Sequence, residues 1–157
     1  MYGFEWGSNS AFTHEFIQRC KRSNVKTLCC DNFYMLQIVI DAVPKLEALV
    51  LSHIYFSKEI HDMIIPQAND IQSPFRPRRS RLPNLHTLSF DRCRFENAES
   101  FRRVVSTCPI REIRMSYSQD SRLVVRGEVY GLDGLEAWLG PGLDLSFSFM
   151  PLGWEIG

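Results

Sequence analysis

Apolar residues return at the same five spacings in three separate stretches of this chain. Counted from the first apolar residue, they stand at positions 1, 4, 6, 9 and 11 of an eleven-residue template. These positions are filled by Val25, Leu28, Cys30, Phe33 and Met35 in the first copy, by Leu46, Leu49, Leu51, Ile54 and Phe56 in the second, and by Leu85, Leu88, Phe90, Cys93 and Phe95 in the third. Positions 4 and 6 share one strand face, so each copy predicts a short strand with one buried face.

A fourth stretch, residues 110–117, keeps only the first part of the template. The four copies begin at residues 25, 46, 85 and 110, which are 21, 39 and 25 residues apart. The spacing of 39 implies an insertion. We place it at residues 67–81, because this segment is polar, interrupted by proline and poor in apolar residues. We expect the insertion to be disordered, since it cannot bury enough apolar surface to become ordered.

The segments between the predicted strands have the spacing of amphipathic helices. In residues 97–108 apolar side chains recur every three or four residues, which places Phe101, Val104 and Val105 on one helical face. Residues 10–20, 35–43 and 57–65 show the same spacing. A proline follows three of these four segments, where it stops a helix. The chain therefore predicts helices and strands in alternation.

The template is the signature of the leucine-rich repeat, in which the ninth position is often Asn or Cys. Such a repeat buries its apolar positions only against neighbouring repeats, so the units stack into a solenoid. We therefore predict one α/β domain over residues 1–157: a short leucine-rich-repeat solenoid with helix–strand repeats, parallel strands and atypical terminal units. Near the C-terminus we expect a strand at 122–129, a helix at 132–139 and a strand at 143–149.

A proline in front of three of the apolar cores makes the resemblance more specific. It stands in Val43-Pro44-Lys45-Leu46, in Leu82-Pro83-Asn84-Leu85 and in Cys108-Pro109-Ile110. Over roughly residues 10–117 the chain resembles the repeat region of fungal-type F-box leucine-rich-repeat proteins. That resemblance implies a scaffold that presents a target protein to a ubiquitin ligase. The family also carries an F-box helical module, and we find none in this chain, so a fragment of a larger repeat protein without independent activity is an alternative.

Charge and composition argue against several classes of function. The 18 Lys and Arg residues balance the 18 Asp and Glu residues, so net charge does not favour nucleic acid or an anionic membrane. No apolar run approaches the roughly 20 residues that span a bilayer. Five cysteines without a C-x-x-C spacing predict neither a disulfide framework nor a zinc ribbon. We expect a cytoplasmic or nuclear protein with no cofactor, no metal, no membrane contact and no small-molecule substrate.

The strand positions between the apolar ones predict a binding face. Alternate side chains of a strand point to opposite faces, so these residues face away from the core, on the concave side of a solenoid. They are small and lightly charged: Thr27, Cys29, Asp31, Ala48, Val50, Ser52, Thr87, Ser89, Asp91, Glu112, Arg114 and Ser116. Concave solenoid surfaces commonly bind proteins, so we predict a protein partner for this face. The alternative interpretation is an ordinary solvated sheet face.

A basic cluster lies within the predicted insertion. Its members are Arg76, Arg78, Arg79 and Arg81, next to Phe75. Loop 75–81 therefore offers an alternative function, a contact with nucleic acid or with the nuclear-import machinery. The other interpretation is a loop that keeps the chain soluble. Four arginines without a wider basic face are a weak signal for nucleic acid, so we rank a protein partner first.

The sequence contains no recognisable catalytic motif. It lacks G-x-S-x-G, H-E-x-x-H and a glycine-rich phosphate loop. His61 has no partner at metal-ligand spacing, and Cys29 has no evident base beside it. We therefore predict no catalytic residue and no enzyme. The predicted function is a protein–protein interaction module, and its most specific form is substrate recognition in an F-box-type ubiquitin-ligase assembly.

Overall fold

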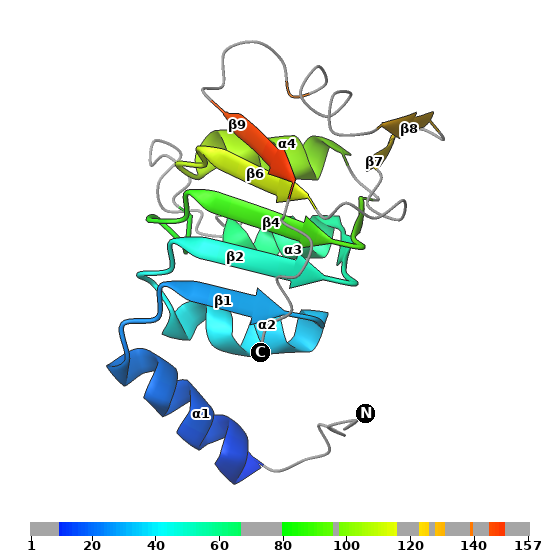
Figure 1. Cartoon of the computed structure of the whole chain (residues 1–157). Helices are drawn as coiled ribbons and strands as arrows, with labels where there is room; N and C mark the ends of the chain where they lie inside the picture. The colour runs from blue at the N-terminus through cyan, green and yellow to red at the C-terminus, as the bar shows by residue number, and fades with distance from the viewer. Residues whose placement is uncertain are drawn as a thin grey trace, which may run out of the picture.

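The computed structural model describes residues 10–66, 80–95, 98–115, 123–125, 128–130, 139 and 145–149, in which helices and strands alternate along most of the chain (Figure 1). The helices are α1 (Ser10–Arg22), α2 (Phe33–Val39), the 3-10 helix η1 (Ile40–Ala42), α3 (Lys58–Ile64) and α4 (Ala98–Thr107). The strands are β1 (Thr27–Cys30), β2 (Ala48–Ser52), β3 (Tyr55–Phe56), β4 (Thr87–Asp91), β5 (Arg94–Phe95), β6 (Glu112–Met115), β7 (Leu123–Val125), β8 (Glu128–Tyr130) and β9 (Ser146–Phe149).

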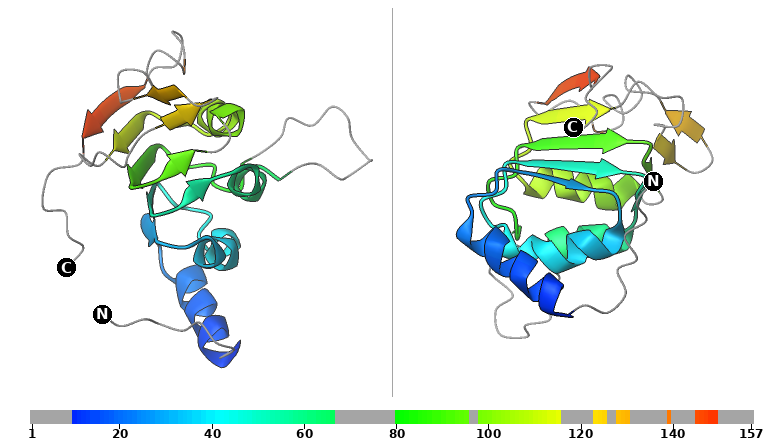
Figure 2. Two further views of the ribbon diagram at one scale, coloured as in Figure 1. Left: turned by 90° about the vertical axis from the view of Figure 1, so that its right-hand side faces the viewer. Right: turned by 60° about the horizontal axis from the view of Figure 1, so that its bottom comes forward.

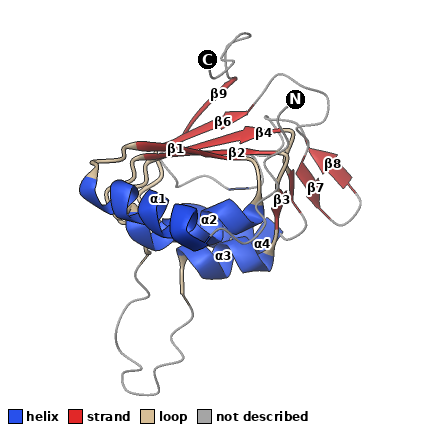
Figure 3. Ribbon diagram, turned by 90° about the horizontal axis from the view of Figure 1, so that it is seen from below, coloured by secondary structure: helices blue, strands red, loops and turns tan. Residues whose placement is uncertain are grey.

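Five of these strands form one open, parallel sheet. Their order is β1-β2-β4-β6-β9, so each strand lies beside the strand of the next copy. The helices lie together on one side of this sheet (Figure 3). Figure 2 shows the same two layers from the side and from below. The predicted α/β class with parallel strands is therefore confirmed.

Equivalent template positions are paired across the sheet. Position 4 aligns Leu28, Leu49, Leu88 and Ile113, and position 6 aligns Cys30, Leu51, Phe90 and Met115. All of these side chains are buried, and all belong to one core cluster that also includes the apolar side chains of the helices. The predicted strands and the buried face of each are confirmed, because a two-residue spacing points both positions toward the helices.

The chain enters successive strands through repeated backbone contacts. The Leu46 N–H donates to the Val43 carbonyl at 3.0 Å, and the Leu85 N–H donates to the Leu82 carbonyl at 3.2 Å. Pro44 and Pro83 are the second residues of these two turns, a position that suits the fixed φ of proline. The carbonyl oxygen of template position 2 then accepts two backbone N–H groups of the next copy. The Lys26 carbonyl accepts from Glu47 and Ala48, the Glu47 carbonyl accepts from His86 and Thr87, and the His86 carbonyl accepts from Arg111 and Glu112.

The two central strands end at residues with left-handed backbone conformation. His53 has φ of 55° and Arg92 has φ of 49°, and both occupy template position 8. The His53 N–H donates to the Asp91 carbonyl at 2.9 Å, and the Arg94 N–H donates to the Ile54 carbonyl at 3.1 Å. These bonds join the turn of the second copy to that of the third, and they lead into the short parallel pair β3–β5. The conformation is uncommon for residues with a Cβ, so the stacked neighbour stabilises it.

Four phenylalanine rings form the centre of the core. They come from β3, β4, β5 and α4, and none is more than 2% exposed. Their centroids lie between 4.8 and 6.2 Å apart, mostly in edge-to-face arrangement. The four residues are Phe56, Phe90, Phe95 and Phe101. The second copy, the third copy and the following helix are thus joined by one aromatic cluster.

The C-terminal elements differ in part from the sequence expectation. Instead of one strand at 122–129 there are two, β7 and β8, which pair antiparallel. A two-residue connection that contains a glycine, here Arg126-Gly127, is typical of a hairpin. The helix expected at 132–139 lies outside the described residues except for Leu139, which is buried in the core. The strand expected at 143–149 is found as β9, parallel to β6.

Candidate binding surfaces

The predicted binding residues lie on the sheet face opposite the helices, but they are not equally accessible. Thr27, Asp31 and Arg114 are exposed, whereas Val50, Thr87 and Ser89 on β2 and β4 are buried. The remaining described members are intermediate: Cys29, Ala48, Ser52, Asp91 and Glu112. Ser116 lies outside the described residues. The accessible groups of this strand face are therefore concentrated on β1 and β6 and at the carboxyl ends of β2 and β4.

One ion pair on the strand face joins neighbouring side chains of β6. Arg114 Nη2 donates to Glu112 Oε2 at 2.8 Å, and the hydroxyl of Ser148 on β9 donates to Glu112 Oε1 at 3.3 Å. The hydrogen bond from Arg114 holds the pKa of the Glu112 carboxyl below its ordinary value. The same bond raises the pKa of the Arg114 guanidinium. Both groups are thus held in their charged forms on this face.

We expect this ion pair to make stability depend on pH in the acid range. Because the pKa of Glu112 is lower in the folded protein, its carboxylate stabilises the fold above the unfolded pKa. That contribution is lost as the pH falls through the folded pKa. Glu112→Gln should therefore lower the free energy of unfolding by about 0.2–1 kcal/mol near neutral pH. Urea unfolding at a series of pH values measures the effect; a difference between wild type and variant that persists in strong acid contradicts it.

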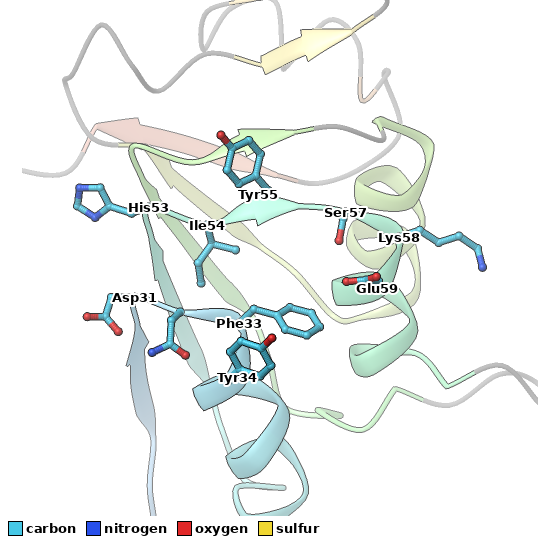
Figure 4. A pocket seen from close by; sticks show the side chains of 10 residues that line it. Asp31, Phe33, Tyr34, His53, Ile54, Tyr55, Ser57, Lys58 and Glu59 are labelled. Atoms are coloured by element: carbon cyan, nitrogen blue, oxygen red, sulfur yellow. The ribbon is translucent and has the colours of Figure 1, made fainter. Parts of the chain in front are cut away.

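A groove of about 760 Å³ lies at the carboxyl ends of β1 and β2 (Figure 4). Its walls come from residues 31–34 of the first copy and from residues 53–55 and 57–59 of the second. Asn32 caps α2, because its side-chain Oδ1 accepts the Met35 N–H at 2.8 Å. The cap fixes where α2 begins and therefore where Tyr34, in the first turn of that helix, meets the groove.

In Figure 4, Tyr55 and Tyr34 lie at opposite edges of the groove with Ile54 and Phe33 between them, while Asp31 and Glu59 lie on the other two sides. Tyr34 is 73% exposed and Tyr55 is 53% exposed. The guanidinium of Arg94 lies 5.8 Å from the centroid of the Tyr55 ring, and its Nη1 donates to the Tyr55 hydroxyl at 3.5 Å. Tyr55 is thus already an acceptor for one cation of the chain itself.

The sequence interpretation missed this groove. Its walls use template positions 7 to 10 of the first copy and positions 8 to 10 and 12 to 14 of the second, so only the pairing of copies brings them together. A usable signal was present at position 10, where an aromatic residue stands between two apolar positions in the first two copies. Those residues are Tyr34 and Tyr55, and Arg94 has the same position in the third copy. In the second copy, Tyr55 stands on the short strand β3 between the buried Ile54 and Phe56, so its side chain points outward.

The basic cluster of the insertion is described only at its end. Arg76, Arg78 and Arg79 lie outside the described residues, as do residues 67–79 as a whole. The Arg81 N–H donates to the Ile64 carbonyl at 2.8 Å, and its Nη1 lies 3.2 Å from Asp41 Oδ1. Arg81 is therefore tied to the end of α3 and to η1, and its charge has a partner in the fold.

The cysteines have the properties of core side chains. All five are free thiols, and every one except the half-buried Cys29 is buried. Burial raises the pKa of the Cys29 thiol, and it raises the pKa of Cys30 to about 12 and of Cys93 to about 11. The Cys93 thiol donates to the Leu51 carbonyl at 3.1 Å, which explains the small polar residue at template position 9. Raised pKa values keep these thiols protonated and poorly nucleophilic near neutral pH.

The described histidines do not assemble a reactive site. His61 is buried in α3, and its Nδ1 lies 2.9 Å from Asp62 Oδ1, so its polar atom has a local partner. In the described part of the chain, no group of three or more His, Cys, Asp or Glu side chains is placed to hold a metal ion.

Comparison with protein-family models, with curated proteins and with solved structures gave no match for this chain. Among the described residues, we find no helix with the length and apolar character needed to cross a membrane. What the protein does must therefore be inferred from its fold and its surfaces.

Proposed function

We propose that the chain is a leucine-rich-repeat solenoid that recognises a partner protein through its strand face. The observation that carries this proposal is the two-sided character of the parallel sheet. Helices cover one side, while the other carries charged side chains on β6 and at the carboxyl ends of β1 and β4. Neighbouring parallel strands lie about 4.8 Å apart, so these groups are spread across several strands of one sheet face, which suits recognition of an extended protein surface.

Repeated local geometry supports the solenoid part of the proposal. The template positions are in register, and the same backbone contacts lead into the strands of successive copies. His53 and Arg92 share position 8 and a left-handed backbone. Such units bury their apolar positions by stacking, as leucine-rich repeats do. The more specific role, substrate recognition in an F-box-type ubiquitin-ligase assembly, is supported by the proline-preceded cores alone.

We expect Arg114→Glu to weaken binding of a partner that contacts the strand face. The substitution places a second carboxylate beside Glu112 and reverses an exposed charge on β6. Reversal of a charge at the centre of an interface should cost about 2 kcal/mol or more, roughly a 30-fold loss of affinity. The partner is captured from an extract of the source cell on immobilised wild-type protein. Titration of the purified partner against wild type and variant then measures the two affinities.

A matched control variant exists on the helical side of the molecule. Arg103 on α4 is similarly exposed and lies 3.3 Å from a glutamate, Glu99, so Arg103→Glu breaks a comparable ion pair. A partner lost on Arg114→Glu and kept on Arg103→Glu supports the proposal, and ligase subunits among the captured proteins support its specific form. Loss on Arg78→Glu without loss on Arg114→Glu contradicts it and favours the basic insertion as the contact.

A further inference from the structure

The groove at the ends of β1 and β2 is lined by two exposed aromatic side chains. Among the described residues, the large hydrophobic side chains that are exposed are Tyr34, Ile38 and Tyr55, and the two tyrosines line the groove. Exposed apolar rings grouped in a hollow mark interaction sites, whereas single ones do not. The groove volume of about 760 Å³ is in the range that receives a small ligand or a few side chains.

Some charged side chains around the groove have an ion-pair partner among the described residues, and others do not. Lys58 is the cationic side chain on its wall, and Lys58 Nζ already lies 3.1 Å from Asp62 Oδ2. Asp31 and Glu59 form neither a hydrogen bond nor an ion pair with any described residue. Asp31 lies on one side of the groove and Glu59 on the other (Figure 4). The groove therefore presents two carboxylates without an ion-pair partner in the described part of the chain, although the whole chain has a formal net charge of zero.

The chain contains an example of the contact that such a groove can make. Template position 10 is Tyr34, Tyr55 and Arg94 in successive copies. Pairing of β3 with β5 sets Arg94 beside Tyr55, where its guanidinium lies over the ring and donates to the hydroxyl. Tyr34, at the same position of the first copy, has the edge of the Phe33 ring as its neighbour at 5.9 Å. Its exposed ring has no such cation from the described chain.

We propose that the groove binds an arginine-bearing segment of a partner protein, with guanidinium groups received by Asp31 and Glu59 and stacked on Tyr34 between them. Arginine fits better than lysine, because its planar guanidinium stacks on a ring and binds a carboxylate through two N–H groups. The groove shares one residue with the strand face, and its other wall residues lie outside that face. Asp31, at template position 7, borders both surfaces.

A synthetic peptide tests the proposal without an identified partner. The probe is a fluorescein-labelled hexapeptide that alternates alanine and arginine, and fluorescence anisotropy measures its affinity. Peptides with lysine or with glutamine in place of arginine have the same length and backbone. We expect the arginine peptide to bind most tightly, the lysine peptide more weakly and the glutamine peptide least. Affinity should fall as salt rises, because exposed charges are screened.

Paired variants locate the binding to the groove. Tyr34→Ala should weaken the arginine peptide about two- to fivefold, the range of an exposed cation–π contact. Ile38→Ala, on the same helix but not on the groove wall, should leave the affinity unchanged. Asp31→Asn combined with Glu59→Gln should weaken binding about tenfold, since each carboxylate contributes up to roughly fivefold. Glu99→Gln on α4 is the charge-matched control for each of the two single carboxylate variants.

The outcomes distinguish this proposal from the proposed strand-face function. All of these side chains are exposed, so thermal unfolding should show folded variants. Arg114→Glu should leave peptide affinity unchanged, because Arg114 is not on the groove wall. The proposal is overturned if the glutamine peptide binds as well as the arginine peptide. It is equally overturned if the double variant keeps its affinity, or if Glu99→Gln loses as much, which indicates diffuse attraction.

Discussion

Leu88→Ala should lower the free energy of unfolding by about 2–5 kcal/mol. Leu88 is completely buried on β4, the middle strand of the five, and its strand partners Leu49 and Ile113 are completely buried as well. Removal of the side chain leaves a cavity between two neighbours that are themselves held in strands. The surrounding residues therefore cannot close it easily, and the cost should lie in the upper part of the range.

The adjacent residue provides the control for this effect. Thr87 points to the opposite face of the same strand, and its hydroxyl lies 3.0 Å from His86 Nδ1. Thr87→Ala should cost about 0.5–1.5 kcal/mol, the value of one hydrogen bond. Urea unfolding followed by circular dichroism gives both values. Equal losses for the two variants would show that β4 does not have the described register.

Phe101→Ala is expected to have a similar or larger effect, about 3–5 kcal/mol. The Phe101 ring on α4 contacts the rings of Phe56, Phe90 and Phe95 at centroid distances of 5.3, 5.4 and 4.8 Å. Alanine is the best helix former, so the substitution leaves the helix intact and isolates the loss of packing. The cluster joins two copies to α4, so its loss should destabilise the sheet as well as the helix.

The neighbouring Arg102 is exposed on α4 and serves as the control for Phe101. Arg102→Ala should change stability by no more than about 0.5 kcal/mol. A second test follows from the cluster itself. The double variant with Phe95→Ala should cost less than the sum of the two single variants, because the rings of Phe95 and Phe101 are in contact. Strict additivity of the two losses would contradict a shared aromatic core.

The sequence predicted the elements in the part of the chain where the template repeats. The two-residue spacing of positions 4 and 6 predicted that Leu49, Leu51, Leu88 and Phe90 share the buried face of their strands. In the structure these four side chains are buried, and they are paired across β2 and β4. Helical spacing located α1 to α4 to within a few residues. These predictions succeeded because burial of one face determines both the two-residue spacing of strands and the three-to-four-residue spacing of helices. The parallel order of strands followed from the stacking of equal units.

The surface features could not be predicted in the same way. The left-handed backbone of His53 and Arg92 depends on hydrogen bonds from the neighbouring copy, not on the residue type. Thr87 and Ser89 look like exposed polar residues in the sequence, yet they are buried on the central strand. Such features depend on distances across copies, which a one-dimensional pattern does not contain.

The segment between α3 and β4 is closed at its base. One hydrogen bond, from the Arg81 N–H to the Ile64 carbonyl at 2.8 Å, brings its two ends together. The length of what lies between them therefore does not alter the register of β2 and β4. Loop entropy rises only with the logarithm of length, about 0.6 kcal/mol for each doubling. This point in the chain is thus suited to evolutionary expansion, and a reporter domain can be grafted there without reshaping the scaffold.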